Sequence, residues 1–130
     1  MIAGLLLLAA QATPAAPLPP ADWRALPPLR YLRPTESGSD LSAFVRAEVR
    51  AGRCARALAS PGGWSLTVEL AVLATPQALV RRVVPRAIGC PAVEQYAAGL
   101  VSSRVRGNLD VSDASQDGWY RTALTFTWPA

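Results

Sequence analysis

The chain has 130 residues, with thirteen arginines, no lysine, nine acidic residues and a formal net charge of +4. This length favours one domain with a modest core. The sequence contains no histidine, which excludes an imidazole base, a Ser-His-Asp triad and histidine metal ligation. A basic surface suits nucleic acid, anionic lipid or peptidoglycan, but a general preference for arginine explains the same composition.

Residues 1–12 have the pattern of a secretory signal peptide. The apolar run Ile2–Ala10 is too short to span a bilayer, and Ala10-Gln11-Ala12 matches a small-x-small cleavage pattern. Prolines follow from Pro14 onward and prevent the apolar run from continuing as a helix. We therefore expect export to the periplasm, no stable membrane span and no nucleic-acid partner.

Residues 13–35 form a leader rich in proline and alanine. The proline density predicts an extended segment with polyproline character and no helix. The second half of the leader carries several apolar side chains, which we expect to lie over the domain that follows at residues 36–130. These are Trp23, Leu26, Leu29, Tyr31 and Leu32.

Residues 36–53 predict a first amphipathic helix, with Ser39 or Asp40 as its N-cap and Gly52 near its end. Apolar residues recur at helical spacing, and arginines lie on the opposite side as a solvated face. The apolar set is Leu41, Phe44, Val45 and Val49, and the arginines are Arg46, Arg50 and Arg53.

A hairpin is predicted after this helix. Ser60–Gly63 is a turn, and Trp64–Ala74 follows with apolar residues at alternate positions, which is typical of a half-buried strand. Thr75–Ala78 forms a second turn, and Leu79–Pro85 provides the other arm of the hairpin.

A second helix and a last strand complete the domain. Pro91 suits the first position of a helix, and Gly107-Asn108 ends it. Its apolar face comprises Val93, Tyr96, Ala97, Leu100, Val101 and Val105. Trp119–Trp128 alternates as a strand. The predicted fold is α+β, with a small antiparallel-rich, three-stranded sheet packed by helices in the order α-β-β-α-β.

The two cysteines, Cys54 and Cys90, predict one disulfide in an oxidising compartment. Such a bond would stabilise the domain by about 3–4 kcal/mol. The alternative is a thiol enzyme, because Cys90 lies at a helix start, where a thiol pKa is lowered. That chemistry needs a partner base, and the absence of histidine disfavours it.

The other residue patterns that could indicate a metal site or a catalytic site give only weak signals. Asp110, Asp113 and Asp117 loosely suggest a calcium loop, but the spacing misses the EF-hand pattern. Glu69 and Glu94 would act as an acid–base pair only if the fold brought them together, and Glu94 suits the first turn of a helix. No glycine-rich phosphate loop is present. We expect no cofactor, no metal site and no enzymatic activity.

The pattern of residues 66–109 and 118–128 resembles the C-terminal domain of the TonB energy-transducer family. Val68, Val72, Val80 and Val83 occupy its hairpin positions, Pro91–Arg106 its helix, and Ala123–Trp128 its last strand. The chain departs from the family in its Thr75–Ala78 turn, in its cysteine pair, and in lacking a membrane anchor and spanning linker of adequate length. The resemblance therefore implies the recognition domain alone.

The resemblance also implies a mode of binding. In this family the last strand accepts an extended peptide by strand addition, and an outer-membrane transporter is one such partner. The corresponding edge residues are Trp119, Tyr120, Arg121, Thr122, Ala123, Leu124, Thr125, Phe126 and Thr127. Two alternatives are an envelope structural protein and a small-ligand carrier with the same sheet, and an exposed edge also permits a homodimer.

Overall fold

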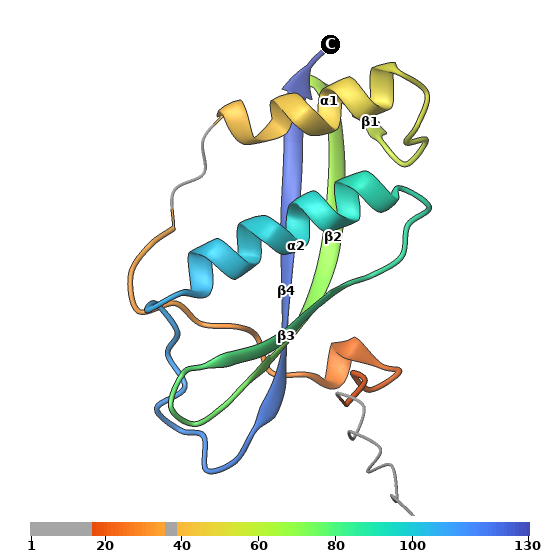
Figure 1. Ribbon diagram of the computed structural model, residues 1–130. Coiled ribbons are helices and arrows are strands. Elements are labelled where there is room, and N and C mark those ends of the chain that lie inside the picture. The colour runs from red at the N-terminus through yellow and green to blue at the C-terminus, as the bar shows by residue number, and fades with distance from the viewer. Residues whose placement is uncertain (1–16, 36–38) are drawn as a thin grey trace, which may run out of the picture.

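The computed structural model describes residues 17–35 and 39–130 (Figure 1). The expected signal peptide, residues 1–12, lies outside the described residues. The chain runs through two short 3-10 helices, two α-helices and four strands. These elements are η1 (Trp23–Ala25), η2 (Ser39–Ser42), α1 (Ala43–Arg50), β1 (Leu58–Ser60), β2 (Gly63–Ala74), β3 (Val80–Pro85), α2 (Pro91–Val105) and β4 (Gly118–Pro129).

Strand β2 is the centre of an antiparallel sheet. Along one edge it pairs with β4 over its whole length, from Gly63 opposite Pro129 to Ala74 opposite Gly118. Its other edge is shared by β1 at one end and β3 at the other. The predicted α+β class is confirmed, but the sheet has four strands instead of three. The additional strand, β1, is exposed at all three residues, so no alternation of buried residues signalled it.

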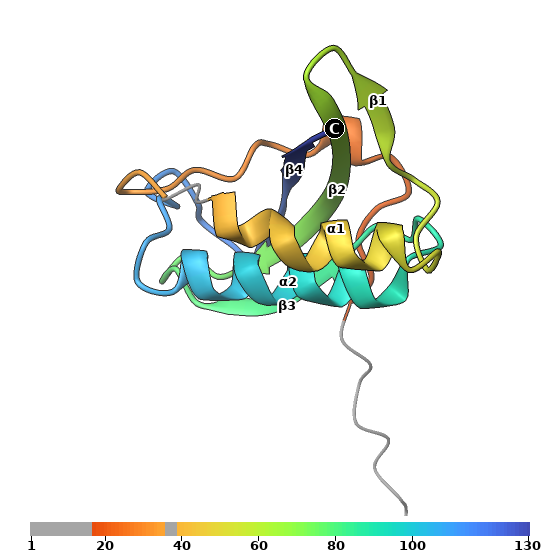
Figure 2. The ribbon, with the colours of Figure 1, turned by 90° about the horizontal axis from the view of Figure 1, so that it is seen from above.

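Helices α1 and α2 cover one face of the sheet (Figure 2). The core between them consists of one apolar face of α2, alternate residues of β2 and β4, and Val45 of α1. The buried positions on α2 are Val93, Ala97, Val101 and Val105, all on the predicted face. Trp64 was predicted on the buried side of β2 but is 41% exposed, because it lies at the turn end of the sheet, bordered by Val49 and Arg50.

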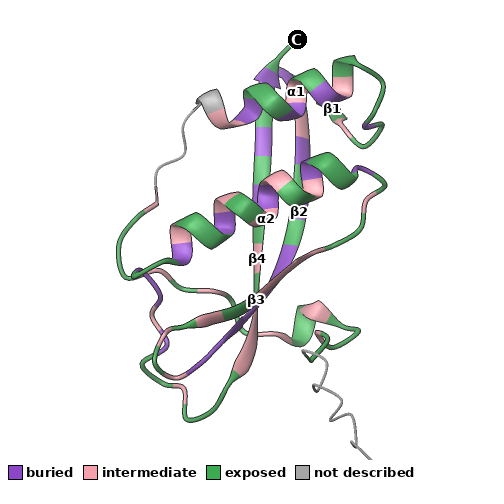
Figure 3. Ribbon diagram, in the orientation of Figure 1, coloured by how far each residue is buried: buried purple, intermediate pink, exposed green. Residues whose placement is uncertain are grey.

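The opposite face of the sheet is partly covered by the leader (Figure 2). Arg82 of β3 donates a hydrogen bond of 3.4 Å to the carbonyl of Pro17, and the guanidinium of Arg86 lies 4.2 Å from the ring centre of Trp23. The prediction that β2 is half-buried is wrong for its second half, because residues 70–75 are buried without alternation (Figure 3).

The leader also contains a short helix that proline density was predicted to prevent. Trp23–Ala25 forms a single 3-10 turn, and the Asp22 side chain caps it by accepting a hydrogen bond from the Arg24 amide. No proline lies between Pro20 and Pro27, so one turn fits between them. Farther on, Tyr31 pairs with Leu109, which confirms that the second half of the leader lies on the domain.

The start of α1 differs from the prediction. The α-helix begins at Ala43, after the 3-10 turn η2, and Ser42 occupies the N-cap position without a side-chain capping bond. The Ser42 hydroxyl instead accepts a hydrogen bond of 3.2 Å from the Thr127 amide of β4. The backbone of Ser39 and Asp40 is described but their side chains are not, so capping by either side chain lies outside what the structure describes.

Candidate functional site: the outer edge of β4

The outer edge of β4 is the edge that faces away from β2. Two hydrogen bonds identify which residues point their backbone groups toward it. The Arg121 amide donates to the Pro27 carbonyl over 2.9 Å, and the Arg121 carbonyl accepts from the Leu29 amide over 2.8 Å. Backbone groups alternate between the two edges of a strand. Ala123, Thr125 and Thr127 therefore also point outward, whereas the even-numbered residues between them bond β2.

The leader occupies one part of this outer edge. Pro28 forms a parallel bridge with Arg121, and the Nε of Arg121 donates to the Leu26 carbonyl over 2.9 Å. The leader then turns away, because the Leu32 amide bonds the Asn108 carbonyl and the Asp110 amide bonds the Arg30 carbonyl. Residues Pro27–Leu29 thus pair with β4 through a single parallel bridge supplied by the same chain.

Tyr31 anchors the leader where it leaves β4. Its ring packs against the buried core, and burial raises the pKa of its phenol, while the charge of Arg104 and a hydrogen bond with Thr122 act in the opposite direction. Nearby, the Asn108 side chain accepts from the Arg33 amide at 2.8 Å and donates to its carbonyl at 3.1 Å. These contacts hold the path of the leader away from Ala123 and Thr125.

The middle of the outer edge has no backbone partner among the described residues. Within residues 17–35 and 39–130, no hydrogen bond uses the outward amides of Ala123 and Thr125. A groove of about 180 Å³ borders this stretch on the helix side, between β4, η2 and α2. Its walls are formed by Leu41, Ser42, Leu100, Arg104 and residues 123–126. The open stretch is bounded by Leu29 at one end and by the Ser42–Thr127 hydrogen bond at the other.

All of the predicted edge residues, Trp119 to Thr127, lie in β4. Their side chains divide between the two faces of the sheet. Leu124 and Phe126 are buried in the core, and Phe126 contacts the Tyr96 ring of α2 at a centroid distance of 5.9 Å. Ala123 and Thr125 are exposed, and the Thr125 hydroxyl lies 2.8 Å from that of Thr67 on β2. Side chains at the open stretch are therefore small on the exposed face and apolar on the other.

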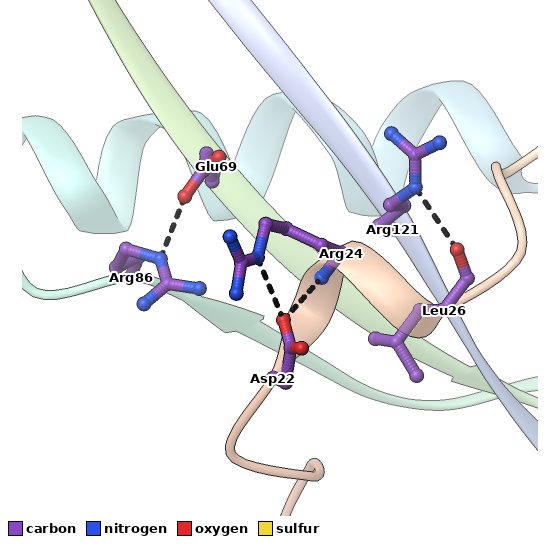
Figure 4. Close-up of polar contacts among 6 residues, drawn as sticks. All are labelled: Asp22, Arg24, Leu26, Glu69, Arg86 and Arg121. Atoms are coloured by element: carbon purple, nitrogen blue, oxygen red, sulfur yellow. Dashed lines mark hydrogen bonds and ion pairs between the residues drawn. The ribbon is translucent and has the colours of Figure 1, made fainter.

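A larger pocket of about 720 Å³ adjoins the same stretch on the exposed face. The leader forms one wall of it and the sheet forms the other. Three arginines from different elements line it: Arg24 of η1, Arg86 after β3 and Arg121 of β4 (Figure 4). Asp22 and Glu69 are the acidic residues of its lining.

The two cysteines form the predicted disulfide. Cys54 and Cys90 are both buried, and their Cα atoms are 5.1 Å apart. The bond joins the segment after α1 to the start of α2, so Cys90 carries no free thiol. The reactive-thiol alternative for Cys90 is therefore wrong in this structure.

The two glutamates considered as an acid–base pair are not brought together. Glu69 lies on the exposed face of β2, where its carboxylate is 2.7 Å from the Nε of Arg86. Glu94 is in the first turn of α2, and its carboxylate accepts hydrogen bonds from the amides of Cys90 at 2.9 Å and Ile88 at 3.2 Å. Glu94 therefore satisfies amides at the helix start, which is a structural role.

The aspartates of the 110–117 loop are also separated. Asp110 accepts hydrogen bonds from the hydroxyl and amide of Ser112, and these bonds lower the pKa of its carboxyl group, with a smaller contribution from the charge of Arg30. Asp117 pairs with Arg81 at 3.0 Å. In the part of the chain that the structure describes, no group of three histidine, cysteine or acidic residues is arranged to hold a metal ion.

Comparison of the chain with family models, curated proteins and solved structures gave no match. None of the helices in the described ranges has both the length and the apolar character needed to cross a bilayer.

Sequence reasoning missed the residues that limit and border the open edge. Pro27–Leu29 were predicted to be extended, but nothing local indicates that they pair with Arg121. Ser42 was assigned to no role, because its partner Thr127 is 85 positions away. The Trp23–Arg86 contact is equally non-local. The apolar character of the leader was the available signal, and it predicted contact with the domain but not the place of contact.

Proposed function

We propose that this protein is a non-enzymatic periplasmic binding module that takes an extended segment of another envelope protein as a strand at the outer edge of β4. The observation that carries the proposal is the open stretch Ala123–Thr125 in a strand that is paired along its whole other edge. Outward amide and carbonyl groups on such an edge form hydrogen bonds with any extended chain of suitable register. An outer-membrane transporter is the partner class that the resemblance to TonB C-terminal domains supports.

The surroundings of the open stretch also support a peptide as the ligand. A strand added there would place alternate side chains toward the groove walled by Leu41 and Leu100 and toward the pocket on the exposed face. Backbone hydrogen bonds would provide affinity, and these two hollows would select side chains. The disulfide agrees with an oxidising compartment.

Proline substitution separates backbone pairing from side-chain contact. Ala123→Pro and Thr125→Pro each remove an outward amide without removing a hydrogen bond to β2. Peptides are first selected from a random hexapeptide library by the wild-type protein. We expect each proline variant to bind the selected peptides about tenfold more weakly or worse, since two or more hydrogen bonds are lost or distorted.

Ala123→Val and Thr125→Val are the matched controls, because they alter the same side chains and keep the amides. The proposal predicts that both valine variants retain binding. It is contradicted if the library yields no peptide, or if the folded proline variants bind as tightly as the wild type. Sedimentation of the free protein tests the homodimer, which would cover the same open stretch.

A further inference from the structure

We infer that the β4 edge receives the C-terminal end of its partner, and that Arg121 binds the terminal carboxylate beside a pocket to which Arg24 and Arg86 add positive charge. This inference rests on the proposed function, since it assigns the direction of the added strand and the part of the partner that is recognised. Two features of the molecule support it: the blocked ends of the open edge, and the charge of the pocket beside one of them.

The leader blocks one end of the open stretch. Pro28 pairs with Arg121 in parallel orientation, so the leader runs in the same direction as β4 and then departs after Leu29. A partner strand paired with Ala123 and Thr125 would meet Leu29 at its next position. An internal segment would have to turn sharply away there, whereas a chain terminus can simply end.

The pocket beside that end of the edge carries three arginines, of which Arg121 belongs to β4 itself and Arg86 lies across β2, next to Glu69. In each arginine the Nε atom already has a partner within the molecule: Asp22 at 3.1 Å for Arg24, Glu69 at 2.7 Å for Arg86, and the Leu26 carbonyl at 2.9 Å for Arg121. No hydrogen bond within the described ranges uses their terminal nitrogens. Figure 4 shows these nitrogens extending away from the Nε contacts.

The pocket also holds Arg86 in a defined position, whereas the side chain of Arg24 is 93% exposed. Arg86 is paired with Glu69 on one side and stacks on Trp23 on the other, so its guanidinium loses less conformational entropy when it binds a ligand. Three positive and two negative side chains line the pocket. A carboxylate beside Arg121 would therefore meet excess positive charge and the planar pair of terminal donors of that guanidinium.

Charge decides the direction of the strand. A partner antiparallel to β4 would bring its C-terminus to Leu29 and the arginines, whereas a parallel partner would bring its ammonium group to the same positive pocket. The first arrangement is attractive and the second repulsive. The structure therefore favours an antiparallel partner whose last residues lie along Ala123–Thr125.

The test compares matched peptides. Random hexapeptides are presented with a free C-terminus, and each selected peptide is then synthesised with a terminal carboxylate and with a terminal amide. We expect the amide to bind about tenfold more weakly or worse, because a charge-assisted hydrogen bond is lost. Arg121→Gln is expected to remove most of this difference, and Arg50→Gln, which removes an exposed arginine of α1 outside the pocket, is expected to preserve it.

The outcomes separate the two proposals. If the amide and the carboxylate bind equally well, and Ala123→Pro still abolishes binding, strand addition stands and the carboxylate inference is overturned. If Arg50→Gln reduces the difference as much as Arg121→Gln does, the effect is one of net charge, and the inference is also overturned. If no peptide binds, both the inference and the proposed function fail.

Discussion

The two edges of β4 have the same length and very different surroundings. The inner edge pairs with β2 at every residue from Gly118 to Pro129. On the outer edge, the leader contacts Arg121 and the Ser42 hydroxyl contacts Thr127, with an open stretch between them. A strand that is held firmly along one edge can bind and release a partner along the other without unfolding.

Breaking the inner edge should have the largest effect. Leu124→Pro removes a hydrogen bond to β2 and a side chain that is only 8% exposed, so we expect the free energy of unfolding to fall by about 3–5 kcal/mol. Ala123→Pro, one residue earlier, should lower it by less than about 1 kcal/mol, since its amide faces outward. Urea denaturation of both variants measures the difference, and equal losses would show that the assignment of the two edges is wrong.

Removal of the disulfide tests whether the sheet and its helices can lose stability while the leader stays in contact with β4. Cys54→Ser combined with Cys90→Ser should lower the free energy of unfolding by about 3–4 kcal/mol, because the unfolded chain gains the freedom of a loop that spans 36 positions. The bond joins α1 to α2 on the helix face, so the contact between the leader and Arg121 should persist in the folded variant. Loss of that contact in the folded variant, seen by NMR, would contradict this view.

Release of the leader should have a smaller effect on stability. Trp23→Ala removes the stacking partner of Arg86, a contact of about 0.5–1 kcal/mol. We expect little change in the unfolding midpoint and faster hydrogen exchange at the Arg121 amide, whose partner is Pro27. Leu18→Ala is the control, since this leader side chain is 74% exposed. Unchanged exchange at Arg121 would mean that Trp23 does not hold the leader on the edge.

The smallest expected effect is on the pH dependence of stability. It involves α1, away from both edges of β4. A bidentate contact with Arg53, at 2.8 and 3.1 Å, lowers the pKa of the Glu48 carboxyl group despite the opposing effect of burial. A carboxyl group with a lower pKa in the folded state stabilises the protein above its unfolded pKa, and this contribution is lost as the pH falls through the folded value. Glu48→Gln should therefore reduce the loss of stability between neutral and acidic pH, and identical pH profiles would contradict the assignment.

The parts of the fold that sequence reasoning predicted are those governed by local patterns. Alternation predicted β2 and β4, the spacing from Val93 to Val105 predicted α2, and the cysteine count predicted the disulfide. Strand β1 lacked alternation because all of it is exposed. The short helix at Trp23 depends on one capping aspartate, a signal that the surrounding prolines outweighed.

The candidate site was predicted only in outline. The alternating residues of β4 placed it in the sheet, and the family resemblance suggested its edge. Which part of the edge is open depends on Pro27–Leu29 and Ser42, whose contacts join positions far apart in the chain. The arginine pocket likewise combines three elements, and no spacing in the sequence relates Arg24, Arg86 and Arg121.

Amide hydrogen exchange along β4 tests the central claim most directly. In the free protein, the Ala123 and Thr125 amides should exchange much faster than those of Leu124 and Phe126, which bond β2. Addition of a selected peptide should slow exchange at Ala123 and Thr125 and leave their neighbours unchanged. Equal protection of all four amides in the free protein, or no slowing at Ala123 and Thr125 with bound peptide, would contradict an open edge that accepts a strand.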